Sequence, residues 1–218
     1  AFVACGALGA WQGWLGLGLT LASWAGLVVL HGRSVHSAEV FARALRDGLA
    51  HDPDAASHLH ELPRDVPFRS IARPFRMRRA GVERIADIPY GPGGRRNHLD
   101  VYRPRESDGL RPTLLQVHGG GWTIGRKDQQ ALPLMNRLAS EGWVCVAANY
   151  RLSPRATFPD HLIDVKRALA WIRTEGARFG ADPDFVVVTG GSAGGHLAAL
   201  LALTANDPRF QPGFEDVD

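Results

Sequence analysis

The run of residues 186–196 constrains the fold of this chain more than any other segment. Three valines and a threonine predict a buried strand, and the segment from Gly190 to Gly194 reads Gly-Gly-Ser-Ala-Gly at the start of an apolar helix. This G-x-S-x-G pattern is typical of a nucleophile elbow, in which a strained turn lifts a serine hydroxyl clear of the backbone so that a base can take its proton. A side chain at Gly190 or Gly194 would clash with the backbone of this turn. The segment therefore predicts Ser192 as a catalytic nucleophile.

A second glycine-rich segment, residues 118–122, supplies what an activated serine needs. It reads His-Gly-Gly-Gly-Trp and follows the apolar run 113–117, a predicted core strand. Three successive glycines let the main chain approach a ligand closely with its N–H groups free. When a serine attacks a carbonyl group an oxyanion forms, and backbone N–H groups stabilise it. The N–H of Ala193, directly after the serine, completes such an oxyanion hole where these two motifs occur together.

From about Arg84 onward, strand patterns alternate with helical ones. Strands are expected at 85–90, 98–102, 113–117, 143–148 and 185–188. A glycine- and proline-rich hairpin connection separates the first two, and the last three are apolar runs typical of parallel strands covered on both faces. Apolar residues from Leu162 to Ile172 recur at helical spacing, with Asp160 near the start as a cap. The alternation predicts an α/β domain with right-handed crossovers.

Together these motifs resemble the hormone-sensitive-lipase branch of the α/β-hydrolase superfamily, and especially its membrane-associated bacterial carboxylesterases and lipases. The resemblance covers about residues 84–214. It is carried by HGGGW at 118–122, NYRLSP at 149–154, Phe158-Pro159 with Asp164 and Trp171, and GGSAGGH at 190–196. It implies an α/β-hydrolase fold, in which helices cover a mostly parallel sheet and this chain contains the N-terminal five strands. It implies no metal and no organic cofactor.

The resemblance also implies roles for residues of the two motifs. Ser192 is the implied nucleophile, and the N–H groups of Gly120, Gly121 and Ala193 are the implied donors to the oxyanion. The other motif residues shape the loops rather than react, and they are His118, Gly119, Trp122, Gly190 and Gly194.

Three further positions have structural meaning in this branch. Tyr150 and Arg151 would belong to a turn after a strand, and Asp164 would pack beneath the site. Many members carry an acidic residue where this chain has Gly191. Any support that such a carboxylate gives to the loop is therefore absent.

The family pattern places the catalytic acid and histidine late in the chain, each after a further strand, and this sequence stops before either. His196 is not expected to substitute as the base, because it lies four residues after the serine on the same helix, where side chains point away from the elbow. The run 185–188 reads as a central strand that needs further strands to cover its edge. We therefore expect a fragment of a longer gene product. The fragment alone should show little or no esterase turnover, since an oxyanion hole and binding leave only residual catalysis.

Three functions are compatible with these motifs. The leading interpretation is a serine carboxylester hydrolase that acts on a small-molecule or lipid ester through an acyl-enzyme on Ser192. Prenylcysteine methylesterases and aryl-formamidases share the HGG-x-W loop and a similar elbow. A non-catalytic relative that binds a ligand or partner is the third, and the loss of either the acid or the histidine after the later strands of the full reading frame would favour it.

The first thirty residues predict a membrane span. Residues 1–30 contain no ionisable side chain except Cys5, and Gln12 is the most polar among them. About 20 apolar residues cross a bilayer as a helix. A buried core helix and a secretory signal are the alternatives, but the first would have a polar face and the second a charged start and a shorter apolar region.

The residues after this segment bear on its orientation. Arg33, Arg43 and Arg46 follow it, and the positive-inside tendency then favours a cytoplasmic hydrolase domain. Residues 31–83 are expected to be a connector or cap region, and residues 84–218 the hydrolase domain. The chain opens on Ala with the apolar run beginning at once, so an upstream segment is expected.

Charge and the other reactive residues favour no additional function. The chain has 25 Lys and Arg against 22 Asp and Glu, for a net charge of +3, and arginines are concentrated between residues 64 and 84. No aromatic or glycine-rich binding motif accompanies them, which favours a solvated linker near a membrane over nucleic-acid binding. His51, His58 and His60 lie among Asp, Pro and Ala without a cysteine, so we expect no metal site. The two cysteines read as packing residues.

Overall fold

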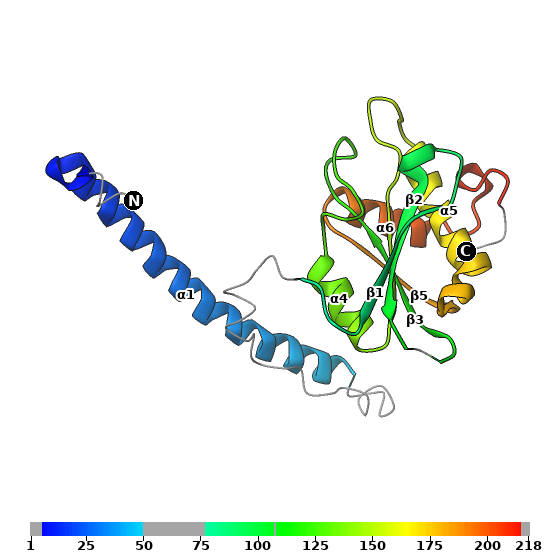
Figure 1. The fold of residues 1–218 in the computed structure, drawn as a ribbon, viewed down its shortest axis with the longest axis horizontal. Coiled ribbons are helices and arrows are strands. Elements are labelled where there is room, and N and C mark those ends of the chain that lie inside the picture. Colours follow the sequence, from blue (N-terminus) through cyan, green and yellow to red (C-terminus); the bar gives the residue numbers. More distant parts are fainter. Residues whose placement is uncertain (1–5, 50–76, 107, 215–218) are drawn as a thin grey trace. The chain divides into compact units, whose positions relative to one another are not determined.

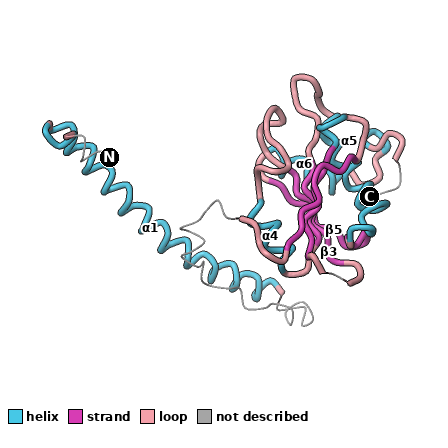
Figure 2. Tube along the Cα trace, in the orientation of Figure 1, coloured by secondary structure: helices cyan, strands magenta, loops and turns pink. Residues whose placement is uncertain are grey.

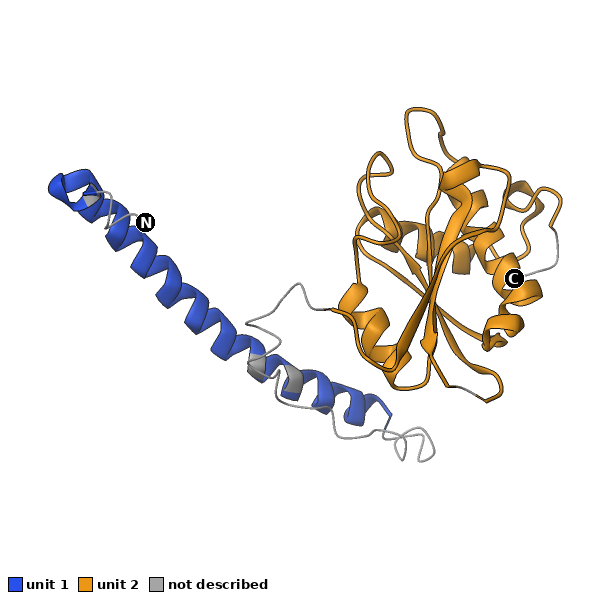
Figure 3. Cartoon of the chain, in the orientation of Figure 1, with its two compact units in different colours: residues 1–74 blue, residues 75–218 orange. Residues whose placement is uncertain are grey.

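The computed structural model describes residues 6–49, 77–106 and 108–214. The chain forms two compact units, residues 1–74 and 75–218, which are drawn in different colours in Figure 3. His51, His58, His60 and Cys5 lie outside the described residues, as does most of the expected connector at 31–83.

The first unit is dominated by one helix. After a short 3-10 turn, η1 (Ala7–Gly9), helix α1 runs from Trp11 to Gly48 over 38 residues. It continues past residue 30, where the apolar segment was expected to end, because no proline or other strong helix breaker interrupts it. At 1.5 Å per residue it is about 57 Å long. Only 6% of its most apolar window is buried, so α1 is not packed as a core helix within the described residues.

The second unit is built on a five-stranded sheet with the strand order β1-β2-β4-β3-β5. The strands are β1 (Val82–Pro89), β2 (His98–Pro104), β3 (Arg111–Val117), β4 (Val144–Ala148) and β5 (Ala181–Gly190). Strand β2 pairs antiparallel with β1 and β4, whereas β3 pairs parallel with β4 and β5. The sheet is therefore mixed, and the expected parallel pairing holds for its β4-β3-β5 half. Each of the five strands overlaps a predicted run (Figure 1).

Helices connect and cover these strands (Figure 2). Helix α4 (Leu132–Ser140) links β3 to β4, and α5 (Asp160–Glu175) followed by η3 (Gly176–Phe179) links β4 to β5. Helix α6 (Ala193–Leu203) follows β5, and η4 (Pro208–Phe210) comes after it. The hairpin between β1 and β2 contains η2 (Gly94–Asn97). Asp160 was expected to cap α5, but it is the first residue of the helix, and Pro159 occupies the cap position. The carboxylate of Asp160 accepts a hydrogen bond from the backbone N–H of Thr157 at 3.3 Å.

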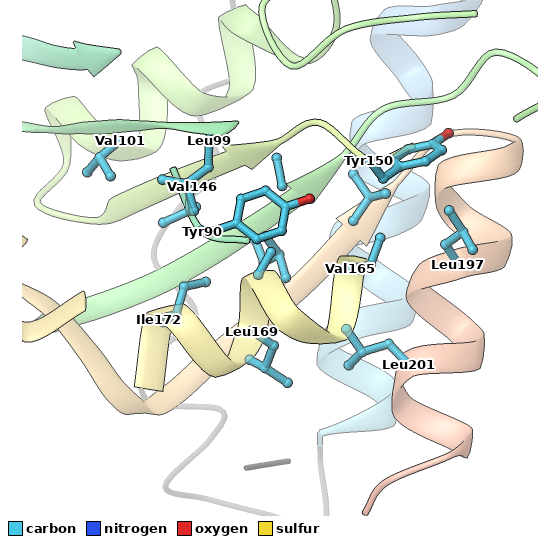
Figure 4. Close-up of a cluster of buried hydrophobic side chains, with 14 of the residues drawn as sticks. Tyr90, Leu99, Val101, Val146, Tyr150, Val165, Leu169, Ile172, Leu197 and Leu201 are labelled. Atoms are coloured by element: carbon cyan, nitrogen blue, oxygen red, sulfur yellow. The ribbon is translucent and has the colours of Figure 1, made fainter. Parts of the chain in front are cut away.

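The two faces of the sheet bury separate cores. Leu115 and Val146 point to one face and pack with Leu162 of α5 and Leu197 of α6, as Figure 4 illustrates for neighbouring side chains. Leu114 and Cys145 point to the opposite face and pack with Met135 and Ala139 of α4. Successive side chains of a strand alternate between faces, so a strand covered on both sides must be apolar throughout. This explains why these strands read as continuous apolar runs.

Strand β5 has an uncovered edge, as expected for the run 185–188 in the absence of further strands. Within the described residues it pairs only with β3. Phe185 and Val187 are 51% and 41% exposed, although the sequence of the strand is that of a buried one.

Candidate active site

Ser192 occupies a strained turn between β5 and α6. Its backbone has φ 53° and ψ −121°, a conformation that is costly for a residue with a side chain. Two flanking glycines make the turn possible, since a Cβ on Gly190 would lie 2.4 Å from the carbonyl carbon of Gly194. A Cβ on Gly194 would lie 2.2 Å from the carbonyl oxygen of Val117. The serine itself is exposed.

Ala193 is the first residue of α6 and is buried directly after the serine. The first N–H groups of a helix have no acceptor within the helix and point along its axis. The next one, of Gly194, donates to the carbonyl of Gly191 at 2.9 Å and closes the turn. The N–H of Ala193 is therefore positioned beside the serine at a helix N-terminus.

The glycine loop after β3 lies against this elbow. A Cβ on Gly119 would lie 2.6 Å from the carbonyl oxygen of Gly191, so the two motifs approach as closely as bare backbone allows. The N–H of Gly119 donates to Oε1 of Gln130 at 2.8 Å. Across residues 77–106 and 108–214, the N–H groups of Gly120 and Gly121 donate to no other group. The N–H groups of Gly120, Gly121 and Ala193 therefore have no acceptor among the described residues, and all three belong to the two motifs around the serine.

The loop then turns sharply. Gly120 has φ 127°, and its carbonyl accepts the N–H groups of Thr123 and Ile124, both at 3.1 Å. Gly121 and Trp122 follow with φ 57° and 60°. This chain of positive φ angles is the reason for the glycine-rich sequence.

His118 supports the loop from beneath. Its ring is buried and stacks on the ring of Tyr150, with centroids 4.4 Å apart. Its Nδ1 lies 2.9 Å from the carbonyl oxygen of Gly119, which can only accept, so Nδ1 carries the proton. Burial lowers the pKa of His118. The imidazole is thus a neutral packing element, in keeping with the loop-shaping role that the resemblance implies.

Two residues that support the loop were not recognised in the sequence. One is Gln130, whose amide holds Gly119. The other is Gly125, which has φ 107° and whose Cβ, if it had one, would lie 2.5 Å from Nδ1 of His118. Gly125 could have been recognised, because it follows soon after the glycine-rich motif. Gln130 is an isolated glutamine, and the sequence gives no signal for its role.

The turn after β4 connects to both α5 and the glycine loop. Asp164, buried on α5, accepts the backbone N–H of Arg151 at 2.8 Å and its Nε at 2.9 Å. The hydroxyl of Tyr150 donates to the carbonyl of His118 at 3.0 Å, and the N–H of Ser153 donates to the carbonyl of Trp122 at 2.8 Å. The NYRLSP segment therefore holds the glycine loop in place, as a structural turn.

A buried ionic network, also missed in the sequence, fixes the far end of the loop. The carboxylate of Asp100 on β2 is fully buried and accepts from Nζ of Lys127 at 2.5 Å and from Nη2 of Arg84 at 2.6 Å. Lys127 also donates to Asp87, which lies at an irregularity of β1. The hydrogen bond from Lys127 lowers the pKa of Asp87. The backbone N–H of Lys127 donates to Oδ1 of Asn149 at 2.8 Å.

A cavity of about 370 Å³ adjoins Gly121 and the first turns of α6. Its lining includes Trp122, Phe158, His161, His196 and Leu197. His161 is buried, which lowers its pKa, and its Nε2 lies 3.3 Å from the hydroxyl of Ser153. A mostly apolar cavity of this size, beside the glycine loop and the first turn of α6, is suited to one part of a small substrate.

His196 makes a contact that the sequence did not predict. Its ring packs edge-on against Trp122, with centroids 5.4 Å apart, and lines this cavity. The reason is that the glycine loop folds over the start of α6 and brings Trp122 to that face of the helix. Within the described residues, Ser192 makes no side-chain hydrogen bond to His196 or to any other histidine.

Cys145 is buried on β4, and burial raises the pKa of its thiol to about 12, so it is a packing residue. In the part of the chain that the structure describes, no group of three or more His, Cys, Asp or Glu side chains could hold a metal ion.

A mixed sheet covered by helices, with a serine elbow after β5 and a glycine loop after β3, defines this unit as an α/β-hydrolase fold of the esterase type. The chain belongs to the BD-FAE family, whose model matches residues 99–217, more than half of its length. The expected fold and the resemblance to carboxylesterases are confirmed.

Individual proteins agree with this assignment. The chain is 53% identical over 180 residues to the "Probable carboxylic ester hydrolase LipM" of Mycobacterium tuberculosis. The aligned segment covers 80% of this chain and 42% of that protein. It is 39% identical over 108 residues to the "Probable isoprenylcysteine alpha-carbonyl methylesterase ICMEL1" of Oryza sativa subsp. japonica, covering 50% of this chain and 25% of that protein. An inhibited esterase B from Lactobacillus rhamnosis superposes with a TM-score of 0.57 at 29% identity, over 68% of this chain and 51% of that one. The chain thus spans about half or less of the length of these proteins.

Proposed function

We propose that the whole protein is a serine carboxylester hydrolase, an esterase or lipase, with Ser192 as its nucleophile. The observation that carries the proposal is the strained backbone of Ser192, held by Gly190 and Gly194 and exposed beside the glycine loop. A fold does not tolerate such strain at an exposed polar residue without a compensating reason, and strain of this kind clusters at active sites.

The reaction follows from this arrangement. The hydroxyl oxygen of Ser192 attacks the ester carbonyl as a base takes its proton, and the carbonyl oxygen becomes an oxyanion. The N–H groups of Gly120, Gly121 and Ala193 donate to that oxygen. Collapse of the tetrahedral intermediate expels the alcohol with a proton from the base and leaves an acyl-enzyme, which water hydrolyses by the same sequence of steps. Removal of one such donor typically costs about 10²–10³ in kcat.

The proposed mechanism also requires a base that takes the proton of Ser192 and an acid that orients this base. We expect both to come from protein beyond this sequence, because the matched segments cover only 42% of the Mycobacterium tuberculosis protein and 51% of the esterase B chain. Further strands there would also cover the exposed edge of β5. The chemistry needs no metal and no organic cofactor, since the serine and the backbone donors supply the nucleophile and the electrostatic stabilisation.

The substrate is a small-molecule or lipid ester. The cavity beside Gly121 is apolar and small enough for one acyl or alkyl group of moderate size. An isoprenylcysteine methylesterase activity is a second candidate, favoured by the similarity to the Oryza sativa protein. The two differ in the ester cleaved, so p-nitrophenyl acyl esters and a prenylcysteine methyl ester distinguish them directly.

The membrane is the second proposed partner. Helix α1 is long and apolar enough to cross a bilayer, and its large apolar side chains, among them Trp14, Leu19 and Val28, are exposed. The arginines Arg33 and Arg43 of α1 favour a hydrolase domain on the cytoplasmic side. Extraction of membranes at alkaline pH tests this proposal, because a spanning helix stays in the pellet, whereas a cleaved secretory signal leaves a soluble product.

A fluorophosphonate probe on the full-length protein tests the nucleophile. Wild-type protein should be labelled on Ser192, and Ser192→Ala should abolish the label. Ser140→Ala is the matched control, because this serine is exposed at the end of α4 and should not affect labelling. Labelling that persists in Ser192→Ala would refute the assignment. Full-length protein that folds but neither labels nor turns over esters would favour the non-catalytic relative.

A further inference from the structure

A second concave surface of the hydrolase unit lies between strands β1 and β2 and helix α4, which Figure 1 shows side by side. Its volume is about 930 Å³, and none of the residues that line it lines the cavity beside Gly121. We call it the arginine groove, after Arg78, Arg79, Arg84 and Arg105, which line it.

The groove carries an excess of positive charge. Glu83 is the one carboxylate among its described lining residues, and it pairs with Arg103 at 3.1 Å. Arg84 is neutralised from beneath by Asp100. The side chains of Arg78 and Arg105, both exposed, make no hydrogen bond or ion pair with any residue that the structure describes. Two guanidinium groups are therefore available to a ligand.

A buried donor lies in the wall of the same groove. Tyr102 is 3% exposed, and the guanidinium carbon of Arg84 lies 5.8 Å from its ring centroid. Its hydroxyl group has no hydrogen-bond partner within the described residues. Burial raises the pKa of Tyr102 to about 12, so the phenol keeps its proton at neutral pH. An unsatisfied buried hydroxyl costs free energy, and a ligand oxygen would remove that cost.

The rest of the lining is apolar. Val82 and Leu132 line the groove and pack against the core cluster beneath α4, and Met77 lies at its start. A water molecule occupies about 30 Å³ in the liquid, and a phosphate ion needs only a few times that volume. The groove is much larger, and an inorganic ion would leave its apolar part without a contact.

We propose that the arginine groove binds the phosphate head of an anionic phospholipid, with Arg78, Arg105 and Tyr102 as its donors and the apolar lining against the first part of the acyl chains. Guanidinium groups bind phosphate oxygens through paired hydrogen bonds. The choice of a lipid as the phosphate-bearing ligand rests on the proposed membrane association. The binding of an anion is argued from the residues of the groove alone. The site is independent of Ser192.

The test uses full-length protein in an uncharged detergent and isothermal titration with two soluble probes. These are dihexanoyl phosphatidylglycerol, below its micellar concentration, and inorganic phosphate. The lipid should bind, and phosphate should bind at least about tenfold more weakly because it gains nothing from the apolar wall. Equal affinity for the two probes would overturn the lipid in favour of free phosphate, and absence of binding by either would overturn the site.

Variants locate the binding. R78Q/R105Q should weaken lipid binding about tenfold or more, since each lost charged hydrogen bond is worth about 1.5–3 kcal/mol. R178Q/R209Q is the control with the same loss of charge, because both arginines are 77% exposed and lie outside the groove. Equal affinity in R78Q/R105Q and in the control would overturn the proposal. Fluorophosphonate labelling of the same variants should be unchanged, so this result is separate from the proposed esterase activity.

The variant Tyr102→Phe tests whether the hydroxyl group of Tyr102 donates a hydrogen bond to the ligand. Loss of a buried, unsatisfied hydroxyl should leave the melting temperature unchanged or raise it. If the hydroxyl donates to the ligand, the affinity for dihexanoyl phosphatidylglycerol should nevertheless fall several-fold. Unchanged affinity would remove Tyr102 from the site.

Discussion

The α-carbon of Gly194 faces the carbonyl oxygen of Val117 so closely that a Cβ would lie 2.2 Å from it. Val117 ends β3 and immediately precedes the glycine loop, whereas Gly194 lies in the first turn of α6. The elbow and the loop are therefore locked together by backbone contact, without an intervening side chain. This contact sets the distance between the nucleophile and its proposed oxyanion donors.

Gly194→Ala should consequently destabilise the protein and abolish labelling. The added methyl group must displace the end of β3 or the start of α6, and overpacking of this kind costs about 3 kcal/mol. Gly191→Ala is the control for folding, since a Cβ there would meet nothing within 4 Å. Urea unfolding of the full-length proteins measures the difference. A Gly194→Ala protein as stable as Gly191→Ala would contradict the close contact.

Gln130 provides a test of the loop that does not touch the serine. Gln130→Ala leaves the N–H of Gly119 without its acceptor, which should cost about 1–3 kcal/mol of stability and loosen the loop. We expect kcat of the full-length enzyme to fall about tenfold with a smaller change in KM, because misplaced donors affect the transition state most. Gln129→Ala is the matched control, as Gln129 is exposed and adjacent. If both variants have the same kcat, Gln130 does not position the loop.

The elbow, the strands and the paired cores could be predicted because each leaves a local pattern. A G-x-S-x-G between an apolar strand and an apolar helix reports its own geometry, and continuous apolar runs report strands covered on both faces. The positions of the Ser192 turn, the glycine loop and the five strands could therefore be predicted from the sequence. In each of these features the residues that form the structure lie next to one another in the sequence.

Features that depend on distant residues left no such pattern. Asp100 and Lys127 are 27 residues apart and read as ordinary surface charges, yet both are buried against each other. The contact between His196 and Trp122 was not predicted, because a separate loop brings Trp122 over the helix. What packs against a side chain on a known helix depends on residues elsewhere in the sequence.

The Asp100 network makes a sharp prediction about stability. Lys127→Met removes one partner of a fully buried carboxylate and should cost about 3 kcal/mol or more, since the remaining charge loses compensation. Arg126→Met is the neighbouring control; this arginine forms an exposed pair with Asp128 and should change stability little. Chemical denaturation of both variants decides the matter. Equal stability would mean that Arg84 alone satisfies Asp100.

The buried histidines predict how stability depends on pH. Burial lowers the pKa of His118 and of His161 in the folded state, so the unfolded chain binds more protons than the folded one as pH falls below about 6.5. Stability contributed by these groups is therefore complete above that pH and is lost as the solution becomes more acidic. His118→Gln should flatten the decline in unfolding free energy between about pH 7 and 5.

His161→Gln should flatten this decline as well, and the double variant should flatten it more than either single variant. Asp87 acts in the same direction at lower pH, because Lys127 lowers the pKa of its carboxylate and protonation there is resisted by the fold. Its contribution persists above its unfolded pKa of about 4 and disappears below it, so the two ranges can be resolved in one series of denaturation curves. An identical pH profile for wild type and for the double histidine variant would show that these imidazoles are not held neutral by burial.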